Sequence, residues 1–311
     1  MSKIKKIIKN ISPLNNRTEM PVMLYIIKVI IIFWFVKFGS EIIGEGIVIA
    51  FLLAVGKNPF HGEIFDSNIM QLIMYYGYVI LIGIMILYWK LFQKKTVAQL
   101  GFTKNAGTYF IGVLAGLVLI IVSVVLVVLS GTITCNGLFD DINGIYILLM
   151  LGGFICQGAM EEVLCRGVVL QLLKDRTAIP VAVGISTALF IIPHLSNFVG
   201  DDVGIIFFAV VNLILISLIF SFLTFSFKSI WAACGFHSIW NFILYNIFGL
   251  NLSGNDKMTA AVFDMRSVGS NILNGGVYGI EASAITAVVL VVALVLIIVI
   301  FNLKGRNEDG I

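Results

Sequence analysis

The chain has 311 residues, of which 59% are hydrophobic and only 12% are charged. Soluble proteins carry about 25% charged residues, so this composition excludes an ordinary soluble domain and indicates a membrane protein. The net charge of +3 says little by itself. No nucleotide-binding motif is present, and we expect no nucleic-acid partner.

Charge-poor apolar stretches run along the whole chain. The first one contains four charged residues. It is too long for one upright crossing of the membrane and too short for two crossings with a turn, so we predict one long tilted helix. Each of the others can supply about 20 residues of spanning helix. The fold class predicted is an all-α, polytopic membrane bundle of about eight transmembrane helices: Val22–Gly56, Ser67–Trp89, Asn105–Phe139, Ile142–Met160, Thr177–Gly200, Val203–Phe227, Ser229–Asn255 and Ala282–Leu303.

The distribution of positive charge sets the expected orientation. Most of the 20 lysines and arginines lie in segments that are cytoplasmic if the N-terminus is cytoplasmic, so both termini are predicted inside. We divide the chain into a basic cytoplasmic segment (1–20), a single membrane domain (21–304) with an external loop (251–281), and a cytoplasmic tail (305–311). Residues 1–20 form either a short helix on the inner leaflet or a disordered basic tail. Abundant Ile, Lys and Asn suggest a bacterial cytoplasmic membrane.

Ionisable and amide side chains occur in three of the predicted spans, where burying them is energetically expensive. Such residues are functional-site candidates by default, because a charged group in the membrane costs a few kcal/mol by insertion scales. The fourth, fifth and seventh predicted helices carry them: Glu161, Glu162 and Arg166 in the fourth, Phe190 and His194 in the fifth, His237 and Asn241 in the seventh.

Helical spacing separates the two neighbouring glutamates. Glu162 and Arg166 are four residues apart and should pair, because residues at this spacing share a face of a helix. Glu161 then points in another direction, with no cation four residues away on its own helix. We therefore interpret Glu161 as the candidate general base, and Glu162 with Arg166 as a scaffolding ion pair.

His237 and Asn241 are also four residues apart, so both project from one helical face. Such a pair could hold an oxyanion. A histidine such as His194, by contrast, often only bonds a backbone carbonyl. Counting about 1.5 Å per residue from the predicted cytoplasmic helix ends, Glu161, His194, His237 and Asn241 lie about 18, 24, 12 and 18 Å deep. These depths overlap, which predicts one site buried among helices 4, 5 and 7.

Taken together and in this order, the motifs resemble those of the CPBP family. These intramembrane proteases are named for CAAX-protein processing and bacteriocin processing, and are also called the Abi family. The resemblance covers about residues 97–249, including the Leu100-Gly101-Phe102 segment before the core. It rests on these residues: Glu161, Glu162 and Arg166; Phe190 and His194; His237 and Asn241.

The resemblance implies a mechanism for these residues. Glu161 and His194 would position and deprotonate a water molecule, while His237 and Asn241 would stabilise the tetrahedral oxyanion. Glu162, Arg166 and Phe190 would support them. No cofactor is expected, although zinc bound by Glu161, His194 and His237 is an alternative, because zinc accepts nitrogen and oxygen ligands. The sequence lacks HExxH, and asparagine is a poor zinc ligand.

The function expected is intramembrane endopeptidase activity on a membrane-bound peptide or protein. In a eukaryote or archaeon the resemblance implies prenylated C-terminal tails as substrates, and in a bacterium leader peptides, bacteriocins or signalling peptides. Two alternatives stay open: a non-catalytic scaffold or bacteriocin-immunity protein of the same family, and a proton-coupled transporter. The intact polar set favours the enzyme, since a scaffold has no need to bury Glu161 and His194.

Overall fold

A computed structural model describes residues 3–198, 202–254 and 261–308 of the chain. For residues 3–6 and 302–308 it describes the backbone alone. Nearly all the regular structure is helical. The helices are α1 (Lys3–Ile11), α2 (Val22–Ala54), α3 (Ser67–Tyr88), α4 (Thr108–Leu129), α5 (Gly144–Glu162), α6 (Leu170–Lys174), α7 (Ile179–Ile191), α8 (Val203–Phe227), α9 (Trp231–Phe242) and α10 (Ala284–Glu308). The strands are β1 (Ile133–Leu138) and β2 (Phe263–Ser267).

Short 3-10 and π segments join or extend these helices. The 3-10 segments are Pro59–His61, Val97–Leu100, Ile192–Asn197 and Ile280–Ala282. The π segments are Trp89–Gln93, Val163–Val169 and Ile243–Ile247. A π turn inserts one extra residue into the helical ladder and frequently marks a functional site. Here one of them begins directly after Glu161 and Glu162.

Seven helices of the described part of the chain are long and apolar enough to cross a membrane. They match seven of the eight predicted stretches, and the prediction of a helical membrane bundle is confirmed. The exception is Ser229–Asn255, where α9 has only 12 residues and ends in the five-residue π turn. With this turn the helical segment is about 25 Å long at about 1.5 Å per residue, shorter than the apolar core of about 30 Å. Every residue of α9 except Trp231 and Ile239 is buried, so this helix is covered by protein.

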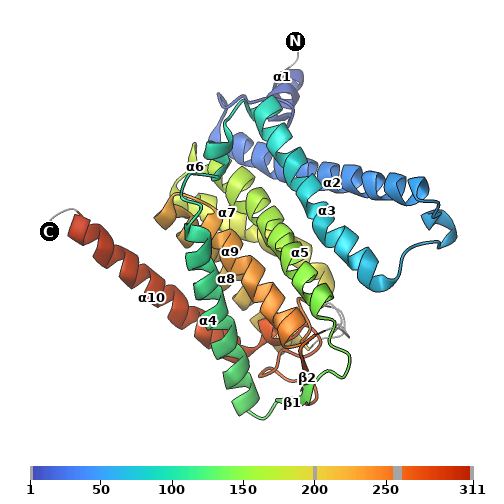
Figure 1. Cartoon of the computed structure of the whole chain (residues 1–311). Coiled ribbons are helices and arrows are strands. Elements are labelled where there is room, and N and C mark those ends of the chain that lie inside the picture. The colour runs from blue at the N-terminus through green and yellow to red at the C-terminus, as the bar shows by residue number, and fades with distance from the viewer. Residues whose placement is uncertain (1–2, 199–201, 255–260, 309–311) are drawn as a thin grey trace.

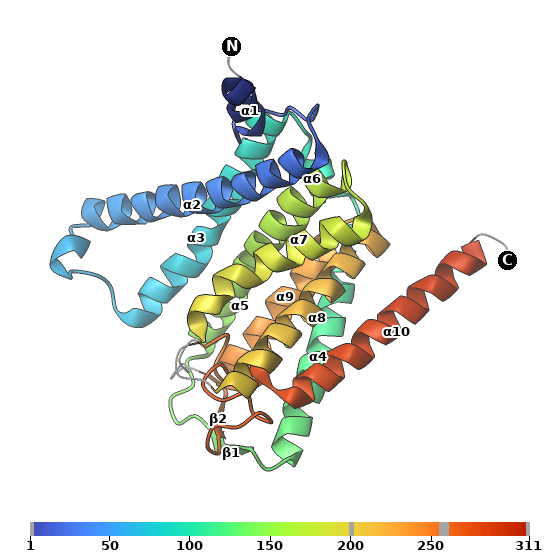
Figure 2. The ribbon, with the colours of Figure 1, turned by 180° about the vertical axis from the view of Figure 1, so that it is seen from behind.

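Helix α9 lies at the centre of the bundle. It packs against α4 on one side and α5 on the other, with α8 also in contact (Figure 1). Helix α10 crosses the outside of α8 and α4, as the view from behind makes clear (Figure 2). Both described chain ends lie on the side of the bundle away from β1 and β2 (Figure 1).

The first apolar region forms a single helix, as predicted. Helix α2 leans strongly across the direction of α4 and α5, and α3 returns beside it (Figures 1 and 2). Three of the charged residues of α2 have partners close by. Lys28 donates a hydrogen bond to the carbonyl of Arg17 at 2.8 Å, and Lys37 forms an ion pair with Glu41 one turn further along. Pairing lowers the energy of carrying these charges in an apolar helix.

The end of the bundle opposite the termini differs from the helical prediction for Asn105–Phe139. Helix α4 stops at Leu129, and Ile133–Leu138 instead forms β1, antiparallel to β2. Because β2 lies in the predicted external loop, far along the chain, the local apolar pattern could not reveal this pairing. The described parts of that loop are folded, for Asn274 donates to the carbonyls of Thr132 at 3.1 Å and Gly269 at 2.9 Å.

Glycines allow α4 and α9 to approach each other closely. A Cβ atom added at Gly235 would lie 2.1 Å from the Tyr109 carbonyl oxygen, and one added at Gly112 would lie 1.9 Å from that of Ala232. Neither distance is compatible with van der Waals contact. The two backbones therefore touch only because both positions lack a side chain, as is common at membrane helix interfaces.

Replacing Gly235 with alanine should force α4 and α9 apart. We expect the free energy of unfolding in detergent to fall by about 1–3 kcal/mol, the usual effect of overpacking a core. Gly184→Ala in α7 is the matched control, because an added Cβ there meets no atom within 4 Å. Equal unfolding transitions for the two variants would contradict this account of the helix contact.

Candidate active site

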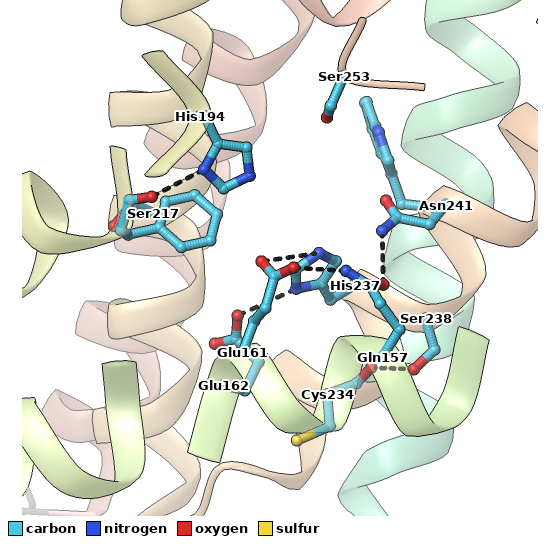
Figure 3. Close-up of polar contacts among 12 residues, drawn as sticks. Gln157, Glu161, Glu162, His194, Ser217, Cys234, His237, Ser238, Asn241 and Ser253 are labelled. Atoms are coloured by element: carbon cyan, nitrogen blue, oxygen red, sulfur yellow. Dashed lines mark hydrogen bonds and ion pairs between the residues drawn. The ribbon is translucent and has the colours of Figure 1, made fainter. Parts of the chain in front are cut away.

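The predicted site residues from three distant stretches line one cavity. Glu161 comes from α5, His194 from the 3-10 segment that follows α7, and His237 and Asn241 from α9. The cavity has a volume of about 300 Å³ and is also walled by residues of α2, α3 and α8. The imidazole of His194 and the amide of Asn241 flank the space above the Glu161 carboxylate (Figure 3).

Glu161 is held by one hydrogen bond and faces one imidazole. Its Oε1 accepts a hydrogen bond from Nε2 of Gln157 at 2.5 Å, one turn earlier on α5. Its Oε2 lies 3.9 Å from Nε2 of His237 and accepts no hydrogen bond from any described residue. One oxygen thus fixes the side chain, while the other stays without a hydrogen-bond partner among the described residues, beside the imidazole of His237.

Gln157 connects Glu161 to Asn241. Its amide oxygen accepts a hydrogen bond from Nδ2 of Asn241 at 2.9 Å, while its amide nitrogen donates to Glu161. An asparagine amide carries two N–H donors, so this contact uses one and leaves one. The bridge orients both the carboxylate and the amide toward the same cavity.

Glu162 joins Arg166 to His237 beneath the cavity. Its Oε1 accepts from Nη1 of Arg166 at 3.0 Å, and it lies 3.1 Å from Nδ1 of His237. The side chains of Glu162 and Arg166 are fully buried. The ion pair predicted from the four-residue spacing is therefore present, and it also positions an imidazole of the site.

Aromatic rings and a serine complete the surroundings of Arg166. Its Nη2 donates to the Ser217 hydroxyl at 2.7 Å, and the guanidinium lies 4.6 Å from the ring centre of Phe190 and 5.1 Å from that of Phe220. Phe220 also stacks on His237, with ring centres 5.2 Å apart. Such contacts favour a buried guanidinium and hold the imidazole in one plane.

A hydrogen bond defines which nitrogen of His194 carries a proton. Nδ1 of His194 lies 2.8 Å from the carbonyl oxygen of Phe190. A carbonyl only accepts, so Nδ1 must donate, and Nε2 of neutral His194 is an acceptor. The contact with a backbone carbonyl, considered from the sequence as a purely structural role, thus also orients the ring.

The sequence prediction missed several polar residues around the cavity. Gln157 lies four residues before Glu161 on the same helical face, and this spacing was the available signal. Glu281 accepts from Nε1 of Trp240 at 3.0 Å and from the backbone N–H of Ser253 at 2.7 Å, and it lines the cavity with Lys37. Glu281 borders a membrane span, and Lys37 lies within one. The charge of each residue at that position was the signal that could have identified it from the sequence.

The zinc alternative requires ligands that converge. Among the described residues, no three His, Cys, Asp or Glu side chains lie close enough to hold a metal ion together. Glu161, His194 and His237 share the cavity, but as placed here they do not form such a group. The fourth predicted catalytic residue is Asn241, and its amide is a poor ligand for zinc.

Comparison with known families bears directly on this geometry. Residues 143–243 match the family described as type II CAAX prenyl endopeptidase Rce1-like. This segment, about a third of the chain, is similar to the Rce1-like family. The Rce1-like segment begins at the N-cap of α5 and ends just past α9, so it contains all four predicted catalytic residues. The resemblance to the CAAX protease and bacteriocin-processing family is confirmed, over a shorter range than residues 97–249.

The family is one of proteases, which supports a peptidase activity for this chain. Comparison with curated proteins and with solved structures gave no significant match. The Rce1-like segment supplies the inner helices α5 to α9. The cavity walls contributed by α2 and α3, and Glu281 beside α10, lie outside it.

Proposed function

We propose that this chain is an intramembrane endopeptidase that hydrolyses a peptide bond with a water molecule activated by Glu161 and His194. One observation carries the proposal: a glutamate Oε2 without a hydrogen-bond partner among the described residues faces an imidazole nitrogen inside a cavity of a membrane-spanning bundle. Placing a carboxylate inside a membrane protein costs free energy, and a role in general acid–base catalysis explains why this glutamate is there.

In this mechanism Glu161 takes a proton from water as the oxygen attacks the carbonyl carbon of the substrate. Nε2 of His194 accepts a hydrogen bond from the same water and orients it, since its Nδ1 is engaged by Phe190. Glu161 then gives the proton to the leaving amine as the carbon–nitrogen bond breaks. The products are a new carboxyl terminus and a new amino terminus.

The second half of the site stabilises the negative charge of the tetrahedral intermediate. Asn241 offers the N–H that Gln157 does not use. His237 donates from Nε2 while Nδ1 donates to Glu162, so the imidazole is doubly protonated at this step and its positive charge faces the oxyanion. Preorganised donors of this kind contribute about 100-fold to 1,000-fold each in a hydrolase.

The substrate we propose is the C-terminal region of a membrane-bound peptide or protein. The name of the matched family suggests a prenylated tail, and in a bacterium a leader peptide would be the equivalent. The predominance of lysines in Lys90–Lys104 and near the termini supports a cytoplasmic orientation of both ends in a bacterial inner membrane.

The decisive experiment is incubation of purified wild type and Glu161→Gln with a library of membrane-associated peptides, with products identified by mass spectrometry. We expect defined cleavage products from wild type only. Cleavage that is equal in both samples would overturn Glu161 as the base. An absence of any cleavage, together with stable capture of a partner, would instead favour the non-catalytic scaffold.

Zinc removal provides an independent test of the mechanism. We expect a strong zinc chelator to leave the rate of peptide cleavage unchanged, because water activation is assigned to Glu161 and His194. Metal analysis of the purified protein is the accompanying control. Loss of activity on chelation that added zinc restores would replace this mechanism with the metal-dependent one.

A further inference from the structure

A second cavity lies at the end of the bundle where α6 and α8 finish. It has a volume of about 270 Å³ and shares no lining residue with the active-site cavity. Three segments far apart in the sequence form it: the Val97–Leu100 turn with its flanks, the end of α6, and the end of α8. Its polar and charged lining residues are Lys95, Gln99, Gln171, Lys174, Asp175, Thr224 and Lys228.

The lining of this second cavity carries an excess of positive charge. Of its three lysines, Lys95 pairs with the one acid, Asp175, at 2.6 Å. Lys174 and Lys228 make no ion pair with any residue the structure describes, and both are exposed. Two uncompensated ammonium groups therefore border one hollow.

The position of the second cavity is that of a membrane surface. It lies where the spanning helices Gly144–Lys174 and Val203–Phe227 end, on the side of the lysine-rich segments proposed to be cytoplasmic. Phe225 and Ala98 add apolar wall beside the lysines. Basic pockets between helices on this side of a membrane suit phosphate-bearing headgroups.

The backbone at Lys228 makes this residue suitable for a substitution test. Lys228 ends α8 in the left-handed conformation, with φ of 49°. Glycine is the preferred residue at such a position, because a Cβ atom makes it unfavourable. A lysine there gives up backbone stability, as Lys94 also does, so a glycine at either position relieves the backbone.

We propose that the second cavity binds the phosphate group of a phosphate-bearing ligand between Lys174 and Lys228. Two sources share this chemistry: the headgroup of an anionic phospholipid of the adjacent leaflet, and free phosphate. The apolar wall at Phe225 favours the lipid. The site is independent of the peptidase proposal, since it uses none of the residues that line the active-site cavity.

Lys228→Gly tests the contribution of the charge to ligand binding without lowering the stability of the fold. This change removes the ammonium group and at the same time relieves the backbone, so the midpoint of thermal unfolding without ligand should not fall. Lys94→Gly is the matched control: Lys94 also has a left-handed backbone, with φ of 57°, and is exposed at a helix end, but does not line the cavity. Lys174→Gln removes the second charge by a different route.

Binding would be measured by native mass spectrometry of the full chain in neutral detergent, with phosphatidylglycerol and phosphatidylcholine as probes, and by thermal shift with inorganic phosphate. We expect wild type and Lys94→Gly to retain phosphatidylglycerol in preference to phosphatidylcholine. Lys228→Gly and Lys174→Gln should each lose about fivefold in affinity, the effect of one lysine near an anionic headgroup. Stabilisation by inorganic phosphate alone, lost in the same two variants, would support the site with a soluble source.

Three results would overturn the proposal. One is equal retention of phosphatidylglycerol and phosphatidylcholine by wild type with no response to inorganic phosphate. Another is unchanged binding in both Lys228→Gly and Lys174→Gln. The third is a loss in Lys94→Gly as large as that in Lys228→Gly, which would show only a general attraction to positive charge.

Discussion

Glu161→Gln should lower the turnover number for peptide cleavage by about 100-fold to 10,000-fold, the contribution usual for a positioned general base. Glutamine keeps the size of the side chain but cannot take a proton from water. The oxygen that accepts from Gln157 is preserved, so the fold should survive. Turnover would be measured on a peptide identified in the library experiment, alongside thermal unfolding of the same preparation.

Glu45→Gln is the control for this prediction. Glu45 is a carboxylate on the apolar helix α2, but it is exposed and does not line the cavity. We expect wild-type turnover from this variant. A Glu161→Gln protein that unfolds at the wild-type temperature and retains more than about a tenth of the activity would refute the assigned base.

Arg166→Met should lower the free energy of unfolding by about 3–5 kcal/mol and abolish cleavage. Removing one partner of a buried ion pair leaves an uncompensated charge in a poorly solvated place, which is strongly destabilising. Arg166 and Glu162 are both fully buried, and Ser217 would lose one of its hydrogen bonds as well. Denaturation in mixed detergent micelles, followed by circular dichroism, provides the measurement.

A double variant divides the effect between charge and catalysis. Adding Glu162→Gln to Arg166→Met removes the stranded carboxylate, so part of the lost stability should return, while activity should not, because His237 has lost its anionic partner. Glu162→Gln alone should lower the free energy of unfolding as well as the rate of peptide cleavage. Additive losses of stability in the double variant, or wild-type activity in Glu162→Gln, would contradict this division of roles.

Local patterns in the sequence were sufficient for a large part of this account. Lipid requires every spanning segment to satisfy its backbone internally, so apolar runs of adequate length had to be helices, and seven of them are. The four-residue spacing of Glu162 and Arg166 predicted their contact because a helix alone determines it. The same reasoning placed His237 and Asn241 on one face of α9.

Other features depended on contacts between residues far apart in the chain. The enclosure of α9 by neighbouring helices is one such feature, and the pairing of β1 with β2, more than 120 residues apart, is another. The bridge from Glu161 through Gln157 to Asn241 and the bond of Glu162 to His237 required α5 to meet α9 in one register.

The sequence by itself determined which segments enter the membrane, how each polar residue lies on its own helix, and which family the core resembles. Only the tertiary structure decided which of those faces meet, and that Glu281 and Lys37 border the same cavity as Glu161. It also decided that two lysines without an ion-pair partner among the described residues border a second cavity. The physical reason is one of range. Periodicity reports the geometry within one helix, whereas a site between helices is set by side-chain packing across interfaces such as the glycine contact of α4 with α9.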